Sequence, residues 1–189
     1  MPAESSPQPA QPPVPLSVRT LPATAVDART EQAWRQLEER ALESNAYLSP
    51  CFILAAVRHL DEGPPPIIVV VETPAAEVVG VGVFTLRRAT RRVPVPHLAA
   101  YRSCHSYLTG LLVDRDRHQE VLSAFFDFFC GPESRWHGVD FSWRTADGPF
   151  AEALDAAAAA HGSAWRERSR RVRALLAPAR AGEAYLETE

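Results

Sequence analysis

The stretch IIVVVETPAAEVVGVGVFTL, residues 67–86, decides the fold. Its first five residues, Ile67 to Val71, are all β-prone, which predicts a strand buried on both faces. Turn-forming residues follow at Thr73 to Ala76, and Val78 to Leu86 return as a second strand. The pattern therefore predicts a β-hairpin whose first strand is covered on both sides.

One strand and two helices are expected before this hairpin. Apolar residues alternate with polar ones over 16–21, which is typical of a short strand. Trp34, Leu37 and Ala41 share one face of a helix over 30–43. Ser49-Pro50 begins a second helix over 52–60, because proline at the first helical position gives up no hydrogen bond.

Two further β-α pairs and a last strand are expected after the hairpin. Strands are predicted over 107–113 and 139–143, and each is followed by an apolar helix. A final strand is expected within 164–176. The order is β α α β β β α β α β, an α/β fold with a mixed central sheet and helices packed on both faces.

The composition is globular and excludes several classes of protein. Hydrophobic residues make up 46% and charged residues 23% of the 189 residues, and the net charge is −3. All 20 basic residues are arginine, so lysine Schiff-base enzymes and the lysine of a P-loop are excluded. Neither a basic field for nucleic acid nor a run of about 18 apolar residues for a membrane is present.

The ends of the chain and its cysteines suggest where the protein works. Seven of the 17 prolines fall in the first 22 residues, so residues 1–14 are expected to be a disordered, proline-rich tail. No export signal is expected in this tail. The three cysteines form no CxxC pair, which favours reduced thiols in a cytoplasmic protein.

Two groups of residues raise the question of metal or nucleophile chemistry. Asp114, Asp116 and His118 have the residue types of metal ligands, but they stand where a helix begins, and capping acids are the favoured interpretation. Cys104 and His105 are adjacent and would point to opposite faces of a strand, so no thiol–imidazole pair is expected. No metal site is predicted.

Arginine runs and tryptophans are the remaining candidates for binding. Guanidinium groups at Arg87, Arg88, Arg91 and Arg92, and at Arg166, Arg168, Arg170 and Arg171, match phosphate or carboxylate, although solvated surface is the commoner role. Trp136, Trp143 and Trp165 are possible groove walls, with core packing as the competing interpretation. By position near the predicted sheet centre, Tyr107, Trp143 and Arg144 are the candidate substrate-binding residues.

Several short matches occur in order along the chain. They are Trp34-x-x-Leu37, Asn45, Ser49-Pro50, Leu111-Leu112-Val113-Asp114, Trp136 with Val139-Asp140-Phe141, Asp147-Gly148-Pro149 and Tyr185-Leu186. Together they cover residues 16–186. With this series the chain resembles the N-terminal half of the bacterial CelD-type (BcsL) acetyltransferases of the GNAT superfamily, which are linked to cellulose or polysaccharide biosynthesis.

The resemblance implies a GNAT-like half-domain over 15–180 and a truncated linker over 181–189 to an absent second half. The second half would hold acyl-CoA. The superfamily binds the cofactor pyrophosphate at a glycine-rich turn that opens a helix, but Val113 to Glu120 contain no glycine and three acids. We therefore expect no cofactor on this chain alone, and acetyl-CoA or another acyl-CoA only when a second GNAT half is present.

Three functions are compatible with these observations. The first is the substrate-side half of a GNAT-type N-acyltransferase, acting on a small-molecule or sugar-amine acceptor with a separately encoded half or as a homodimer. The second is a complete but divergent acetyl-CoA-dependent N-acetyltransferase, with Glu72, His105 or Asp114 as the base. The third is a non-catalytic module that docks a separate GNAT half through an exposed apolar surface.

Overall fold

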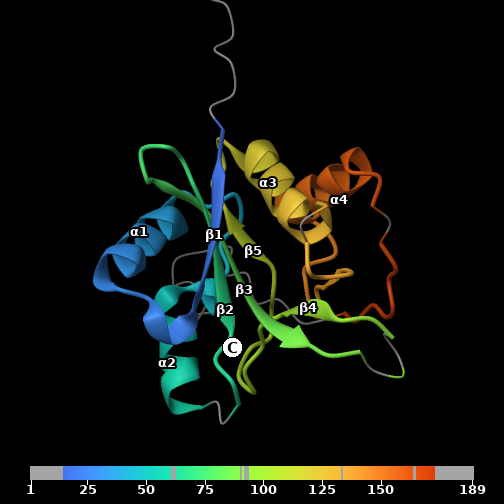
Figure 1. Cartoon of the computed structure of the whole chain (residues 1–189), viewed down its shortest axis with the longest axis horizontal. Coiled ribbons are helices and arrows are strands. Elements are labelled where there is room, and N and C mark those ends of the chain that lie inside the picture. Colours follow the sequence, from blue (N-terminus) through green and yellow to red (C-terminus); the bar gives the residue numbers. More distant parts are fainter. Residues whose placement is uncertain are drawn as a thin grey trace, which may run out of the picture.

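The computed structural model describes residues 15–60, 63–89, 91, 94–132, 134–163 and 165–172, which form four α-helices and one six-stranded mixed sheet (Figure 1). The strands are β1 (Ser17–Pro22), β2 (Ile67–Glu72), β3 (Val78–Arg87), β4 (His97–Ala100), β5 (Leu111–Val113) and β6 (Val139–Asp140). The helices are α1 (Ala28–Glu39), α2 (Pro50–His59), α3 (His118–Cys130) and α4 (Pro149–Ala160). Single 3-10 turns at Ala23–Ala25 and Ala46–Leu48 precede α1 and α2. The mixed α/β class expected from the sequence is confirmed.

The predicted hairpin is present and forms the middle of the sheet. β2 and β3 pair antiparallel from Ile67↔Phe84 to Val71↔Gly80, and β1 pairs antiparallel with the other edge of β2. The ten-residue β3 is long enough to pair with two short strands on its far edge. β5 pairs with its first half and β4 with its second.

The last strand makes the sheet mixed. β6 pairs parallel with β4, so that the order is β1-β2-β3-β4-β6. The chain passes from β5 through α3 to reach β6, the kind of crossover that parallel neighbours require.

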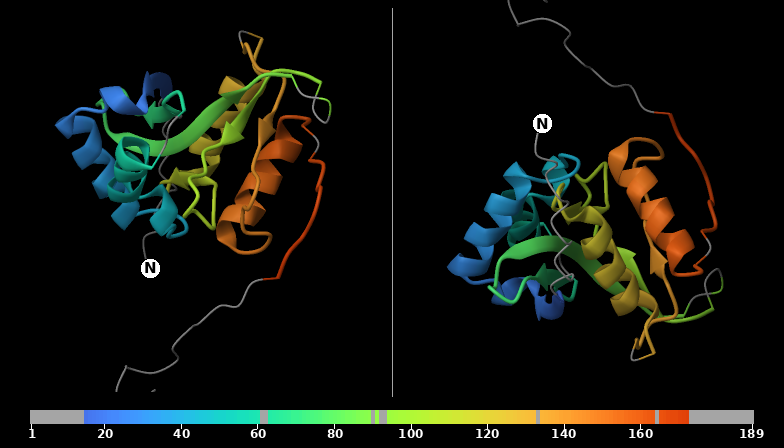
Figure 2. Two further views of the ribbon diagram at one scale, coloured as in Figure 1. Left: turned by 90° about the horizontal axis from the view of Figure 1, so that it is seen from below. Right: turned by 90° about the horizontal axis from the view of Figure 1, so that it is seen from above.

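Helices cover the sheet on both faces (Figure 2). Ile68 and Val70 face the cluster that includes Trp34 and Ile53 of α1 and α2. Their neighbours Val69 and Val71 face the cluster that includes the phenylalanines of α3. All four side chains of β2 are fully buried, as the run of β-prone residues predicts.

The strand expected over 107–113 is wrong in its extent. Only Leu111–Val113 is strand, while β4, at His97–Ala100, falls in a stretch for which the sequence predicted no regular structure. The residues between them form a loop because side-chain hydroxyls take backbone partners there. Ser103 and Ser106 are buried and bond to the loop itself, in competition with a sheet ladder.

The two other strands predicted in the C-terminal half also differ from the structure. The strand expected over 139–143 ends at Asp140, because Trp143 adopts a left-handed backbone conformation that interrupts it. Within the expected strand 164–176, residues 165–172 are extended but form no strand, and the remainder lies outside the described residues. Side chains hold this segment instead, with Trp165 against Phe126 and Phe141.

The helix boundaries shift by a few residues. The helix predicted over 30–43 spans Ala28–Glu39, and Asp27 caps it by accepting a hydrogen bond from the Thr30 amide (2.7 Å). Pro50 is the first residue of α2, as the Ser49-Pro50 signal indicates, but the Ser49 hydroxyl donates to Glu38 rather than capping the helix.

The predicted tail, 1–14, and the predicted linker, 181–189, lie outside the described residues. Of the helices in the described part of the chain, none has the length and apolarity needed to cross a bilayer.

Candidate functional site

Two loops meet at the carboxyl ends of the parallel strands. The loop 101–110 follows β4 and the loop 141–148 follows β6, and we call them the paired loops. Thr109 joins them, since its amide donates to the Trp143 carbonyl (3.2 Å) and its hydroxyl to the Ser142 carbonyl (2.5 Å). Ligands of α/β proteins bind most often outside the carboxyl ends of parallel strands. The paired loops are therefore the candidate functional site.

The loop 101–110 is held from inside by buried hydroxyls. The Ser103 amide donates to the Ser106 hydroxyl (3.2 Å), and the two hydroxyl oxygens lie 3.1 Å apart. The Ser103 hydroxyl also accepts from the His105 amide (3.3 Å). This internal bonding leaves Arg102, Cys104, His105 and Tyr107 exposed on a loop of defined shape.

Trp143 has a strained backbone at the centre of the paired loops. Its φ is +70°, a conformation that costs a bulky residue about 1–3 kcal/mol and persists only where surrounding contacts enforce it. The bonds from Thr109 supply that enforcement. The guanidinium carbons of Arg102 and Arg171 lie 5.2 Å and 5.0 Å from the centre of the Trp143 ring.

Glu43 anchors the other side of the loop 141–148. Its carboxylate accepts hydrogen bonds from the Thr145 hydroxyl and from the Phe150 amide, both 3.2 Å long. A carboxylate at the start of α4 is favoured by the helix dipole. The loop 141–148 that contains Trp143 is thus held by Thr109 on one side and by Glu43 on the other.

The three predicted substrate-binding residues are placed differently from one another. Tyr107 is 57% exposed, and its ring centre lies 6.0 Å from that of Tyr47. Trp143 is half-buried between the paired loops. Arg144 is held by an ion pair with Asp155 (3.1 Å) and lies 5.8 Å from the Trp165 ring. Tyr107 and Trp143 therefore offer aromatic surface at the candidate site. Arg144 instead links its loop to α4 through Asp155.

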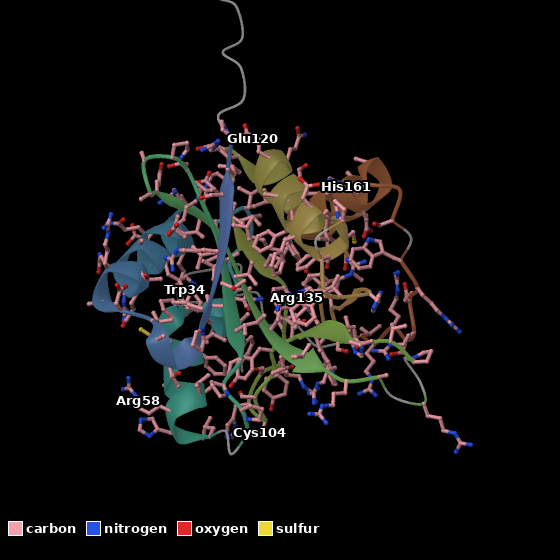
Figure 3. The ribbon with its side chains drawn as sticks, in the orientation of Figure 1. Trp34, Arg58, Cys104, Glu120, Arg135 and His161 are labelled. Atoms are coloured by element: carbon pink, nitrogen blue, oxygen red, sulfur yellow. The ribbon has the colours of Figure 1, made fainter. Side chains whose placement is uncertain are left out.

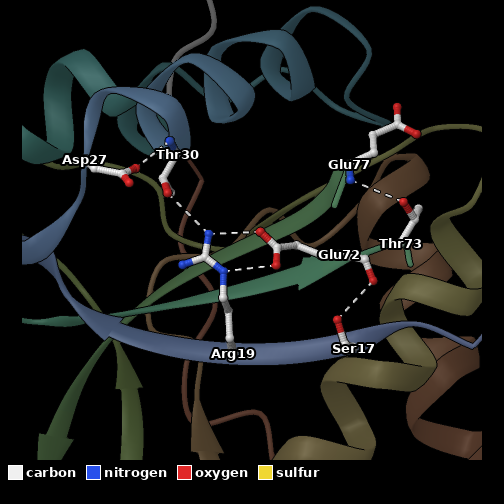
Figure 4. Close-up of polar contacts among 7 residues, drawn as sticks. All are labelled: Ser17, Arg19, Asp27, Thr30, Glu72, Thr73 and Glu77. Atoms are coloured by element: carbon white, nitrogen blue, oxygen red, sulfur yellow. Dashed lines mark hydrogen bonds and ion pairs between the residues drawn. The ribbon is translucent and has the colours of Figure 1, made fainter. Parts of the chain in front are cut away.

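Glu72, a candidate base, lies at the end of β2 in an ion pair (Figure 4). The Arg19 Nε and Nη2 atoms donate to its two carboxylate oxygens at 3.0 Å and 2.9 Å. Arg19 also donates to the Thr30 hydroxyl (3.2 Å). In the same group of residues, the hydrogen bond from the Thr30 amide holds the pKa of exposed Asp27 below its usual value.

Asp114, a second candidate, is buried in another ion pair. Arg40 Nε donates to its Oδ2 (2.5 Å), and the Asp116 amide donates to its Oδ1 (2.9 Å). Arg40 also pairs with Glu77 (2.9 Å) and donates to the Val78 carbonyl (2.7 Å). To act as a base, Asp114 would first have to leave this network.

His105, the third candidate, is exposed beside Cys104 in a turn, with no thiol–imidazole bond between them in the described structure. Figure 3 shows Cys104 at one end of the molecule and Glu120, at the start of α3, at the other. Glu72 and Asp114 flank the first residues of β3, where each is held in its own ion pair. Of the three, only His105 belongs to the paired loops.

The residues considered as metal ligands do not form a cluster. Asp114 is engaged by Arg40, and the His118 Nδ1 atom lies 2.8 Å from the Arg115 carbonyl oxygen. Within the described ranges, His, Cys, Asp and Glu side chains nowhere gather in threes as a metal ion would need.

The arginine runs divide between paired and open side chains. Arg168 pairs with Asp140, and Arg170 pairs with Glu167 (3.0 Å). Arg87, Arg88 and Arg91 are exposed, and Arg92 lies outside the described residues.

Sequence reasoning missed Arg102, Thr109, Glu43 and the position of Arg171 over Trp143. No local pattern marks them, because each acts through a partner at least 28 residues away in the chain. The Trp143 conformation carries no signal either, since left-handed residues are ordinarily glycine or asparagine.

Two shallow depressions lie away from the paired loops. One, of about 350 Å³, runs between α1 and the turn before β3, with Arg29, Gln32 and Glu77 in its lining. The other is an apolar groove along α2 that includes Phe52 and Leu60. Neither contains a predicted base.

No known protein family, curated protein or solved structure has a significant match to this chain. In the described part of the chain, the paired loops and the turn before α3 are the two features considered below. The loops offer aromatic and cationic side chains, and the turn offers a helix start.

Proposed function

We propose that this chain is the acceptor-side half of a GNAT-type N-acyltransferase, whose acyl-CoA is held by a second half. The resemblance in the order of short motifs motivates this proposal, and the order of elements from β1 to α4 is compatible with it. The observation that carries it is the turn between β5 and α3. Under this proposal, the turn corresponds to the position at which the superfamily holds the cofactor pyrophosphate.

The amides of this turn have partners of their own. The amides of residues 114 to 117 donate, in order, to the Val79 carbonyl, the Arg40 carbonyl, the Asp114 side chain and the Asp114 carbonyl. A helix start binds phosphate through free amides that point at the ligand. These four amides are engaged, and the turn has no glycine to let its backbone approach a ligand closely, so we expect it to bind pyrophosphate poorly.

The paired loops are the proposed place for the acceptor amine. Trp143 and Tyr107 supply rigid aromatic surface of the kind that binds a sugar or another small molecule. Transfer by direct attack of the amine on a thioester needs mainly proximity and a base for the amine proton. His105 is the candidate base, because Glu72 and Asp114 are held in ion pairs.

The first experiment is calorimetric titration of the chain alone with acetyl-CoA. We expect no saturable heat, because the amides of residues 114 to 117 already have partners and the turn contains no glycine. Stoichiometric, tight binding would overturn the two-half proposal and favour a complete single-domain enzyme.

The second experiment measures acyl transfer by a reconstituted pair. The chain is co-expressed with a GNAT cofactor half encoded next to it and supplied with acetyl-CoA and a panel of amino sugars. We expect transfer only when both chains are present, and about 10²-fold slower transfer with His105→Ala. His59→Ala, an exposed histidine on α2, is the matched control and should change nothing. Equal transfer by the cofactor half alone would contradict the proposal.

A further inference from the structure

We propose that Arg102, Trp143 and Arg171 form a binding site for a phosphate group, in particular for a phosphate monoester. The two guanidinium groups approach one indole ring from segments 69 positions apart in the chain. Their carbons lie about 10 Å apart at most, given the two distances to the ring centre. The site would bind this anion whether or not the chain takes part in acyl transfer.

The first argument is charge. Two like charges on one ring repel each other, and an anion beside them would lower that energy. Among the described residues, no carboxylate pairs with Arg102 or Arg171. Asp140, at the end of β6, is engaged elsewhere, since it pairs with Arg168 and accepts a hydrogen bond from Ser142.

The second argument is the local conformation. Trp143 has a left-handed backbone conformation, and hydrogen bonds from Thr109 on the other loop hold it there. Strain of this kind is concentrated at sites that clamp a ligand. Here the strained residue is Trp143, and its ring is the one that both arginines contact.

The third argument selects phosphate over carboxylate. A guanidinium fork matches two oxygens of either anion, but a carboxylate has only two oxygens and one charge. A phosphate monoester carries nearly two charges and three terminal oxygens, so it can satisfy both arginines together. The side chains are exposed, which leaves room for the esterified group.

The test follows the guanidinium Nε–H signals of Arg102 and Arg171 by NMR during titration at low ionic strength. The probes are inorganic phosphate, glucose 6-phosphate and acetate. We expect saturable shifts with both phosphates, and about tenfold weaker binding of acetate. Tighter binding of glucose 6-phosphate than of phosphate would identify the monoester as the ligand, and the reverse order would identify free phosphate.

Variants separate this site from general charge. Arg102→Gln and Arg171→Gln should each weaken phosphate binding several-fold, and the double variant about 10²-fold. Arg166→Gln is the matched control, because Arg166 is exposed on the same segment as Arg171 and is not placed over Trp143. Unchanged melting temperatures would confirm that the fold is intact, since the substituted side chains are exposed.

Two results would overturn the proposal. One is the absence of saturable shifts at Arg102 and Arg171 with either phosphate. The other is an equal loss of binding in Arg166→Gln and Arg171→Gln, which would show attraction to the basic segment as a whole.

Discussion

At the scale of single residues, backbone conformation reveals what side-chain chemistry does not. Two residues other than glycine in the described structure have positive φ, Trp143 at the candidate site and Ala76 in the β2–β3 turn. Ala76 is exposed, and its amide donates to the Thr73 carbonyl (2.8 Å). The left-handed conformation of Ala76 therefore belongs to the hairpin turn, whereas that of Trp143 belongs to the candidate site.

Ala76→Gly should stabilise the protein by up to about 1 kcal/mol. The left-handed conformation costs an L-residue about 1–2 kcal/mol, and the added entropy of glycine in the unfolded chain cancels about half of the gain. Ala75→Gly, one residue away and without positive φ, is the control and should destabilise by about 0.5 kcal/mol. Urea unfolding checks both. Equal destabilisation by the two substitutions would contradict this account of Ala76.

At the scale of elements, strand β3 and helix α3 pack directly against each other. Gly80 of β3 lies under α3, where an added Cβ would come 2.5 Å from Val121 Cγ1 and 3.0 Å from the Phe125 ring. Both of these α3 residues are fully buried. The missing side chain therefore sets how closely α3 approaches the strand.

Gly80→Ala should destabilise the fold by about 1–3 kcal/mol, because the methyl group must displace buried side chains. Gly63→Ala is the control, since a Cβ there would have no atom within 4 Å. Its effect should stay within about 0.5 kcal/mol. Thermal or urea unfolding of both variants checks the prediction. A neutral Gly80→Ala would mean that α3 can move away from β3 at no cost.

At the scale of the whole molecule, one buried ion pair joins the two sides of the sheet. Arg40 follows α1, and Asp114 follows β5 and precedes α3. Their contact, together with the bond from Arg40 to the Val78 carbonyl, links helix, sheet and crossover. The side chain of Asp114 is only 7% exposed.

Arg40→Met should cost about 3 kcal/mol, because it leaves the Asp114 carboxylate buried without its partner. Arg117→Met is the control, since it breaks the more exposed pair with Glu120 and should cost less than about 1 kcal/mol. Denaturant unfolding compares the two. If both variants lost the same stability, the pair would not carry the structural role given to it here.

Much of the fold could be predicted from the residues, but little of the candidate site. The run Ile67 to Val71 and the Ser49-Pro50 signal predict their elements, because burial pattern and proline geometry are local properties. Trp143 could be selected only by its type, and the alternation around it predicted a strand over 139–143 that in the structure ends at Asp140. Glu72 and Asp114 could be named as acids, but not as partners of Arg19 and Arg40.

By itself, the sequence determined the hairpin and the order of most elements. Its lack of lysine excluded the enzymes that need that side chain. The tertiary structure alone decided that β6 lies parallel to β4, that Thr109 holds Trp143, and that Arg102 and Arg171 lie over its ring. The physical reason is the distance along the chain over which each kind of interaction acts. Propensity and burial act between near neighbours in the chain, whereas each of these contacts joins residues that only the folded sheet brings together.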